Sequence, residues 1–227
     1  QKRDGSAMHQ FFPSTMEATV GDSHEFPDRP HFYGDDHLWI ILAVNAYIKE
    51  TGDMDFLKTE IPFYEKDADK KPLEKATVLE HLKRAIKFTW ENKGKHGLPL
   101  LGFADWNDTV NLRTGAESNF VAPQFGKALL EMIDMMEALG DSAAVSEYKK
   151  YYNEMKETVN KETWDGEWYL RYLDCDGSKL GSKDNKYGSI YVNAQSWNIM
   201  AGFADKDRAV TAMESVRKHL NTSNGIK

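Results

Sequence analysis

The segment Gly102–Asp108 concentrates side chains suited to carbohydrate chemistry. Asp105 and Asp108 flank Trp106 and Asn107 in a loop bounded by glycines. Glycosidic cleavage needs an acid that protonates the leaving oxygen, and a flat aromatic ring can stack on the apolar face of a sugar. From these residues alone a second interpretation stays open, in which an Asx turn caps a helix while Trp106 packs inward.

A second pair of carboxylates, Asp35 and Asp36, precedes an apolar stretch. Aspartate at a helix N-terminus satisfies free backbone N–H groups and complements the helix dipole, which is the simpler interpretation. In the functional interpretation one aspartate caps the helix and the other hydrogen-bonds sugar hydroxyls. Arg29 lies close in sequence and could donate to an anion.

Glu117 precedes another apolar stretch and is open to two interpretations, an acid in the first turn of a helix or a site residue on the same rim. The chain has one cysteine, and its amino-terminal histidines lack the i, i+4 spacing of helical metal ligands, so we expect no metal site. No glycine-rich motif for cradling phosphate occurs either. The candidate chemistry therefore rests on carboxylates and aromatic rings.

Hydrophobic periodicity predicts a chain built largely of helices. We expect helices over 36–49, 54–58, 77–92, 122–139, 142–162, 193–201 and 205–220, and one strand over 164–173 with a turn at 174–177. The first 34 residues show no period, and a stretch of that kind usually covers a site or serves one. A Met-rich stripe within 122–139 is expected to fill the core.

A similar three-residue pattern ends several of these helices and caps the helix that follows. It occurs at Thr51-Gly52-Asp53, Leu139-Gly140-Asp141 and Phe203-Ala204-Asp205. This suggests successive antiparallel helix pairs in which apolar helices alternate with amphipathic ones. A barrel of inner and outer helices would produce that alternation, and the loops that carry Asp, Trp and His would then share one rim.

Composition excludes several classes of protein. The chain has 227 residues, of which 41% are hydrophobic and 29% charged, with a net charge of −7. One cysteine rules out a disulfide framework, and the acidic balance argues against a nucleic-acid partner. No apolar run is long enough to cross a membrane, and the start lacks the apolar stretch of a signal peptide. We therefore expect a cytoplasmic protein with no membrane partner.

Taken together, these segments resemble glycoside hydrolase family 94, the cellobiose and chitobiose phosphorylase family. The stretches that match, in the family's order, are 35–39, 50–53, 97–100, Asp105-Trp106-Asn107-Asp108, 115–118, 164–171, 181–182, 193–197 and 212–216. Where the family carries an arginine shortly before the Asp-Asp pair, this chain has Arg29-Pro30-His31.

The resemblance implies an all-α fold, an (α/α)6 barrel with a small β-hairpin insertion. It implies inverting phosphorolysis of a β-glucosidic bond in a disaccharide or β-glucan oligosaccharide, which yields a sugar 1-phosphate. Asp108 would be the general acid, Trp106 would line the sugar subsite and Asp36 would bind the non-reducing sugar. Further substrate-binding candidates are Asp35, Glu117, Gln195 and Arg29. Inorganic phosphate would be the co-substrate and no cofactor is implied; the family is often dimeric.

The chemistry explains why one acid can suffice. An inverting hydrolase needs a second carboxylate about 6.5–9.5 Å away to activate water. Phosphate is already a nucleophile, so Asp105 is free to be structural. Two alternatives stay open: an inverting (α/α)6 hydrolase in which Asp35 or Glu117 activates water, and a non-catalytic helical domain that binds carbohydrate.

The motif order also predicts that residues 1–227 form an interior part of a catalytic domain. The family's amino-terminal β-sandwich, the carboxy-terminal part of the barrel and further phosphate ligands would then lie outside this chain. An incomplete barrel would expose the apolar faces of its inner helices. We therefore expect this chain alone to be marginally stable and prone to associate, with its own activity an open question.

Overall fold

A computed structural model describes all residues from Gln1 to Lys227. It contains six α-helices: α1 (Asp36–Thr51), α2 (Val78–Glu91), α3 (Val121–Leu139), α4 (Ser142–Glu162), α5 (Val192–Met200) and α6 (Lys206–Leu220). Two 3-10 helices, η1 (Gly21–Glu25) and η2 (Met54–Lys58), accompany them. The short strands are β1 (Gln10–Phe12), β2 (Glu17–Thr19), β3 (Glu60–Pro62), β4 (Lys75–Thr77), β5 (Glu117–Ser118), β6 (Tyr172–Leu173), β7 (Lys179–Leu180), β8 (Asn221–Thr222) and β9 (Gly225–Ile226).

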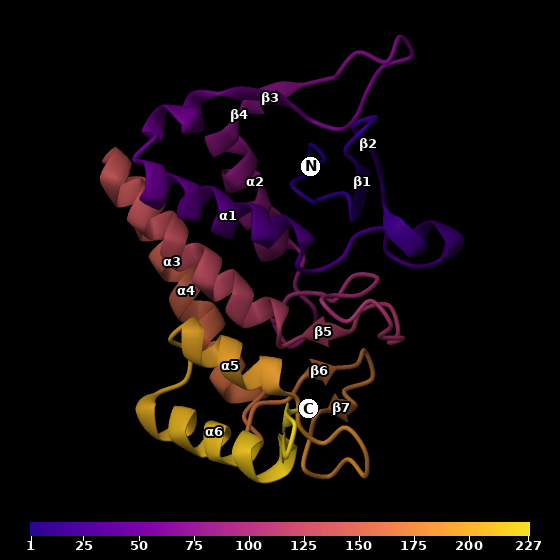
Figure 1. The fold of residues 1–227 in the computed structure, drawn as a ribbon, viewed down its shortest axis with the longest axis vertical. Helices are drawn as coiled ribbons and strands as arrows, with labels where there is room; N and C mark the ends of the chain where they lie inside the picture. The colour runs from indigo at the N-terminus through magenta and orange to yellow at the C-terminus, as the bar shows by residue number, and fades with distance from the viewer.

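The helices follow one another as packed pairs along the long axis of the molecule (Figure 1). α1 packs on α3 and α3 on α5, while α2, α4 and α6 each pack on the helix that precedes or follows them. α3 is the centre of the core, and its methionines Met132, Met135 and Met136 are buried as expected. The prediction of a largely helical domain is confirmed, and closure of the helices into an (α/α)6 barrel stays a prediction.

Glycines at helix ends and aspartates at helix starts set several of the helix boundaries. Gly52 and Gly140 adopt left-handed φ values of 73° and 75° at the ends of α1 and α3, a conformation that costs glycine little. The side chains of Asp53, Asp141 and Asp205 then accept hydrogen bonds from the backbone amides three residues on, at the starts of η2, α4 and α6. The predicted caps are therefore confirmed.

The β-structure departs from the sequence-based expectation. Residues 1–34, expected to be irregular, contain the antiparallel hairpin β1–β2 as well as η1. The strand expected over 164–173 is wrong for most of its length, because the chain turns at Gly166, where φ is 92° and the Asp165 amide donates to the Trp168 carbonyl at 2.9 Å. Only β6 remains extended, and it pairs with β5 and β7 in a three-stranded antiparallel sheet.

The longer connecting segments, which carry β1, β2, β5, β6 and β7, gather at one end of the helices (Figure 1). The Gly34 amide donates to the Ala104 carbonyl at 2.9 Å, which joins the start of α1 to the loop after α2. The Asn119 amide donates to the Arg171 carbonyl at 3.0 Å, which joins that loop to the sheet. Segments that carry Asp and Trp side chains are thus brought together, as the barrel argument anticipated. No helix of the structure has the length and apolarity that a membrane span needs.

One side of α1 and α5 exposes apolar side chains. Trp39, Tyr47 and Met200 have relative exposures of 37%, 43% and 52%. A shallow groove of about 280 Å³ beside these helices is lined by Leu42, Ala46, Trp197 and Met200, together with the charged side chains of Lys49, Lys127 and Glu131. Exposed apolar surface that is contiguous favours association.

We therefore expect residues 1–227 in isolation to self-associate with increasing concentration. Met200→Lys should shift the distribution toward monomer, because it places a charge on the apolar face. Sedimentation velocity measures both effects. Leu73→Lys is the matched control, since Leu73 is 50% exposed in the β3–β4 connection, away from this face. Monodisperse monomer at all concentrations would contradict the expectation.

Candidate active site

A cleft of about 750 Å³ opens where the amino-terminal segment, the start of α1 and the loop after α2 meet. Its lining residues are His9, Asp35, Asp36, Trp39, Asp105, Trp106 and Asp108. The lining contains four carboxylates, one imidazole and two indoles, and no lysine or arginine. It therefore combines most of the residues that the sequence singled out for sugar chemistry.

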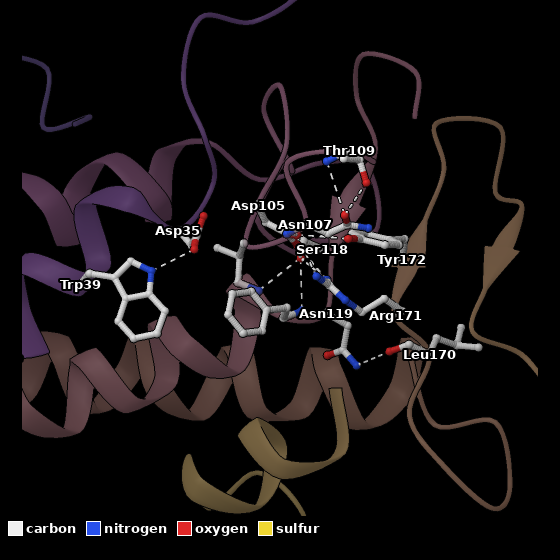
Figure 2. Close-up of polar contacts among 12 residues, drawn as sticks. Asp35, Trp39, Asp105, Asn107, Thr109, Ser118, Asn119, Leu170, Arg171 and Tyr172 are labelled. Atoms are coloured by element: carbon white, nitrogen blue, oxygen red, sulfur yellow. Dashed lines mark hydrogen bonds and ion pairs between the residues drawn. The ribbon is translucent and has the colours of Figure 1, made fainter. Parts of the chain in front are cut away.

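Asp105 anchors the loop that forms one wall of the cleft. Asp105 and Arg171 are each 1% exposed, and the guanidinium donates to both carboxylate oxygens at 2.7 Å (Figure 2). Ser118 Oγ and Tyr172 Oη also donate to this carboxylate, at 2.6 and 3.0 Å. Both oxygens of this carboxylate are thus occupied by donors from other segments of the chain. The expectation that Asp105 is structural agrees with this environment.

The same loop projects Trp106 and Asp108 outward. The Asn107 amide donates to Asp105 Oδ1 at 3.1 Å, so the Asx turn considered from the sequence is present. It does not bury the indole, because Trp106 is 68% exposed. The Asp108 side chain is 61% exposed. The anchored aspartate thus fixes a turn whose next residues present a free ring and a free carboxyl.

Trp106 is part of an aromatic wall. Its ring centroid lies 6.3 Å from that of Trp39, which in turn meets Trp197 edge-on at 5.6 Å. Trp39 comes from α1 and Trp197 from α5. Indole rings offer large flat apolar surfaces at little conformational cost. The wall therefore provides a surface on which a pyranose could stack.

Neither aspartate side chain makes a capping hydrogen bond to α1, which corrects the cap expected in both interpretations, although Asp36 lies in the first turn of the helix. No side chain accepts a capping hydrogen bond at this helix start. Asp35 is 3% exposed and accepts a hydrogen bond from Trp39 Nε1 at 2.9 Å (Figure 2). Burial raises the pKa of Asp35 to about 7. Burial also raises the pKa of Asp36, and contact with His9 Nδ1 at 3.0 Å opposes that rise.

Glu117, a candidate from the sequence, lies in β5 and points away from the cleft. It is 1% exposed and accepts hydrogen bonds from the Leu98 amide at 3.0 Å and from the amide and Nδ1 of His96. Glu117 does not lie in the first turn of a helix either, because α3 begins only at Val121. The amides of Phe120 and Val121 at this helix start donate to Ser118 Oγ. These contacts make Glu117 a support for residues 94–98.

Gln195 and Arg29 also bind backbone rather than the cleft. Gln195 is fully buried; its Oε1 accepts from the Tyr169 amide and its Nε2 donates to the Tyr169 carbonyl, both at 2.8 Å. Arg29 donates to the carbonyls of Phe103 and Leu112 at 2.8 and 3.2 Å. Both side chains fix loops around the cleft, and neither belongs to its lining.

The sequence-based reasoning gave no role to Arg171 or His9. A signal for Arg171 existed, since a lone charge within the apolar run 169–173 must find a buried partner. Nothing in the spacing of His9 pointed to a carboxylate 27 residues away. No group of three or more metal-ligating side chains is present in the structure.

Breaking the buried pair of Asp105 and Arg171 should cause a measurable loss of stability. Asp105→Asn and Arg171→Met should each lower the free energy of unfolding by about 3–5 kcal/mol, because either change leaves a buried charge without its partner. Urea denaturation of residues 1–227 measures the loss. Lys58→Met is the control: Lys58 and its partner Asp55 are 79% and 85% exposed, so about 0–1 kcal/mol is expected. Losses no larger than the control's would contradict the anchoring role.

Asp35 makes stability depend on pH. Its pKa is about 7 in the folded chain against 3.8 for the free group, so the folded state retains a proton that the unfolded chain releases. The resulting stabilisation is complete below about pH 4 and disappears as pH rises through about 7.

The unfolding free energy of the wild type relative to Asp35→Asn should therefore fall by up to about 1.4 kcal/mol per pH unit across this window. Denaturation at a series of pH values measures the difference. Asp28→Asn, at an exposed aspartate of the preceding loop, is the control for an aspartate-to-asparagine change outside the cleft. A difference for Asp35→Asn that is constant with pH would refute the assignment.

Comparisons with known proteins identify the family. The model of the glycosyl hydrolase 94 superfamily catalytic domain matches residues 1–227. Solabiose phosphorylase from Paenibacillus borealis is 32% identical over 99% of this chain and 30% of its own length. N,N'-diacetylchitobiose phosphorylase from Vibrio proteolyticus is 33% identical over 93% of this chain and 26% of its own length. The chain thus spans less than a third of these relatives.

Among solved structures, the GH78 family rhamnosidase of Bacillus sp. GL1 superposes with a TM-score of 0.60 over 83% of this chain and 18% of that chain. The two are 16% identical, so this likeness concerns the fold alone. The family resemblance drawn from the Asp-Asp and Asp-Trp-Asn-Asp segments is confirmed by the match over the whole chain. This chain belongs to the glycosyl hydrolase 94 superfamily, whose catalytic-domain model matches residues 1–227.

Proposed function

We propose that this chain supplies the acid side of a site for inverting phosphorolysis of a β-glycosidic bond, with Asp108 as the general acid. The proposal rests on the different environments of the two aspartates in the Asp-Trp-Asn-Asp loop. The Asp105 carboxylate accepts hydrogen bonds from Arg171, Ser118 and Tyr172. The Asp108 side chain, in contrast, is 61% exposed at the cleft. One carboxyl of the loop is therefore free to meet a leaving group.

The proposed reaction needs a single protein acid. Asp108 donates its proton to the glycosidic oxygen as the bond to the anomeric carbon breaks. An oxygen of inorganic phosphate attacks that carbon from the opposite face, which inverts its configuration and yields a sugar 1-phosphate. In this proposal Trp106 stacks on the substrate, while Asp35 and Asp36 hydrogen-bond its hydroxyls.

The charge of the cleft bears on where phosphate binds. Its lining has four carboxylates and no lysine or arginine, and Arg29 is occupied by backbone carbonyls. An anion would be repelled from this lining unless cations are supplied by residues outside it. We therefore assign the phosphate ligands to other segments of the intact protein and drop Arg29 from the candidates.

The relatives support the substrate class. Their printed names describe phosphorylases of solabiose, N,N'-diacetylchitobiose and cellobionic acid. We infer that this chain likewise serves a disaccharide or oligosaccharide phosphorylase with no cofactor beyond phosphate. Its helices would then form part of an (α/α)6 barrel, with the cleft at the rim where the loops meet.

Inverting hydrolysis is the second candidate, and Asp35 is the observation that favours it. A carboxyl whose pKa is about 7 is poised to act as a base on water at neutral pH. Glu117 is not available for this role, because it is buried and bound to the 96–98 segment. The two candidates differ in whether the sugar is released by phosphate or by water.

Asp108→Asn should lower turnover of the natural substrate about 10³-fold or more in the intact protein, with little change in KM, because the amide keeps the shape and loses the acid. Phosphorolysis measured as sugar 1-phosphate formation checks this. Asp69→Asn, at an exposed aspartate of the β3–β4 connection, is the matched control and should leave the rate unchanged.

Near-normal turnover of Asp108→Asn would sink the assignment. Free sugar formed at the same rate without phosphate would favour the hydrolase. Titration calorimetry with oligosaccharides separates the remaining alternative, since binding without any turnover by the intact protein would indicate a non-catalytic carbohydrate-binding domain.

A further inference from the structure

His9 lines the cleft and lies between two carboxylates that come from different segments. Its Nδ1 is 3.0 Å from Asp36 Oδ2, and its Nε2 is 3.9 Å from Asp108 Oδ1. The first distance is a hydrogen bond, and the second is an electrostatic contact that is too long for one. The two nitrogens of one ring thus face the proposed sugar-binding carboxylate and the proposed acid.

The surroundings hold this ring in place. The imidazole stacks on Tyr33 with centroids 3.5 Å apart and planes 9° from parallel, and its side chain is 18% exposed. Gly21 lies against the ring edge with a φ of +62°; a Cβ there would approach His9 Cδ2 to 2.5 Å. The one imidazole of the lining is therefore packed into one orientation.

We propose that His9 is a positioning residue that links Asp36 to Asp108, so that the sugar-binding carboxylate and the acid keep a fixed separation across the cleft. This inference rests on the proposed function of Asp108. The Asp36 carboxylate accepts a hydrogen bond from Nδ1–H, which leaves Nε2 directed at Asp108. The approach of Nε2 to Asp108 Oδ1 at 3.9 Å then favours orientations of the Asp108 side chain that face the ring.

The arrangement also limits repulsion within the cleft. Asp36 is partly buried, and the negative charge of Asp108 adds to the rise of its pKa while His9 opposes that rise. Asp105 has its own cation in Arg171, so Asp36 and Asp108 are the carboxylates that depend on His9. Without the ring these two groups would separate, since Asp108 is 61% exposed and free to rotate.

Kinetics of the intact protein test the link to Asp108. His9→Asn keeps an amide near the Nδ1 position and removes the group at Nε2. It should lower kcat for the natural substrate about 10²-fold with little change in KM. An aryl β-glycoside with a nitrophenol leaving group, which departs with little protonation, should retain most of its rate. His31→Gln, at an exposed histidine of the same segment, should leave both rates unchanged.

A wild-type kcat for His9→Asn would overturn the proposal. Equal losses on both substrates would overturn it as well, because a general loss of structure would have that effect. The substrate-dependent loss supports it.

Nuclear magnetic resonance tests the geometry without requiring any activity, so it separates failure of this inference from failure of the proposed function. Residues 1–227 with ¹⁵N-labelled histidine should show the neutral His9 ring protonated at Nδ1. Asp36→Ala should return it to the Nε2–H form that free histidine prefers, while amide dispersion confirms that the variant is folded. An Nε2–H ring in the wild type would overturn the proposal.

Discussion

The buried ion pair between Asp105 and Arg171 is the interaction on which the cleft depends. It joins the loop after α2 to the residue before β6, and Ser118 and Tyr172 complete the set of donors. A buried pair of this kind contributes little net stability but is costly to break. Its effect here is to determine where the next residues of the loop lie. Trp106 and Asp108 are exposed at the cleft because Asp105 is fixed beneath them.

This arrangement gives the two carboxylates of one short motif opposite environments. Asp105 is surrounded by donors and a guanidinium, whereas Asp108 is largely exposed and lies 3.9 Å from the His9 imidazole. Pairs of like groups placed in unlike environments are how proteins assign different roles to the same residue type. At the start of α1, Asp35 is buried beside Trp39 while Asp36 is held by His9, so the same principle operates on both walls of the cleft.

The features that could be predicted from the sequence are those set by residues close together along the chain. The caps Asp53, Asp141 and Asp205 act within three residues of themselves, so their spacing is visible along the chain. Arg171 meets Asp105 across 66 residues and Gln195 meets Tyr169 across 26, so their roles depend on the tertiary fold. The same limit explains why Glu117 and Gln195 looked like site residues: motif order shows that a residue matters, and only its contacts show whether it binds substrate or a backbone amide.

In the proposed reaction this cleft binds the sugar and supplies the acid, while residues outside the cleft bind phosphate. An acidic lining suits a neutral sugar and an acid catalyst, and it disfavours an anion unless cations lie on the opposite face of the substrate. The most direct test is ¹H NMR of the first product that the intact protein forms from a β-linked substrate in phosphate buffer. The account predicts an α-configured sugar 1-phosphate. A free sugar, or a sugar 1-phosphate of retained β configuration, would contradict it.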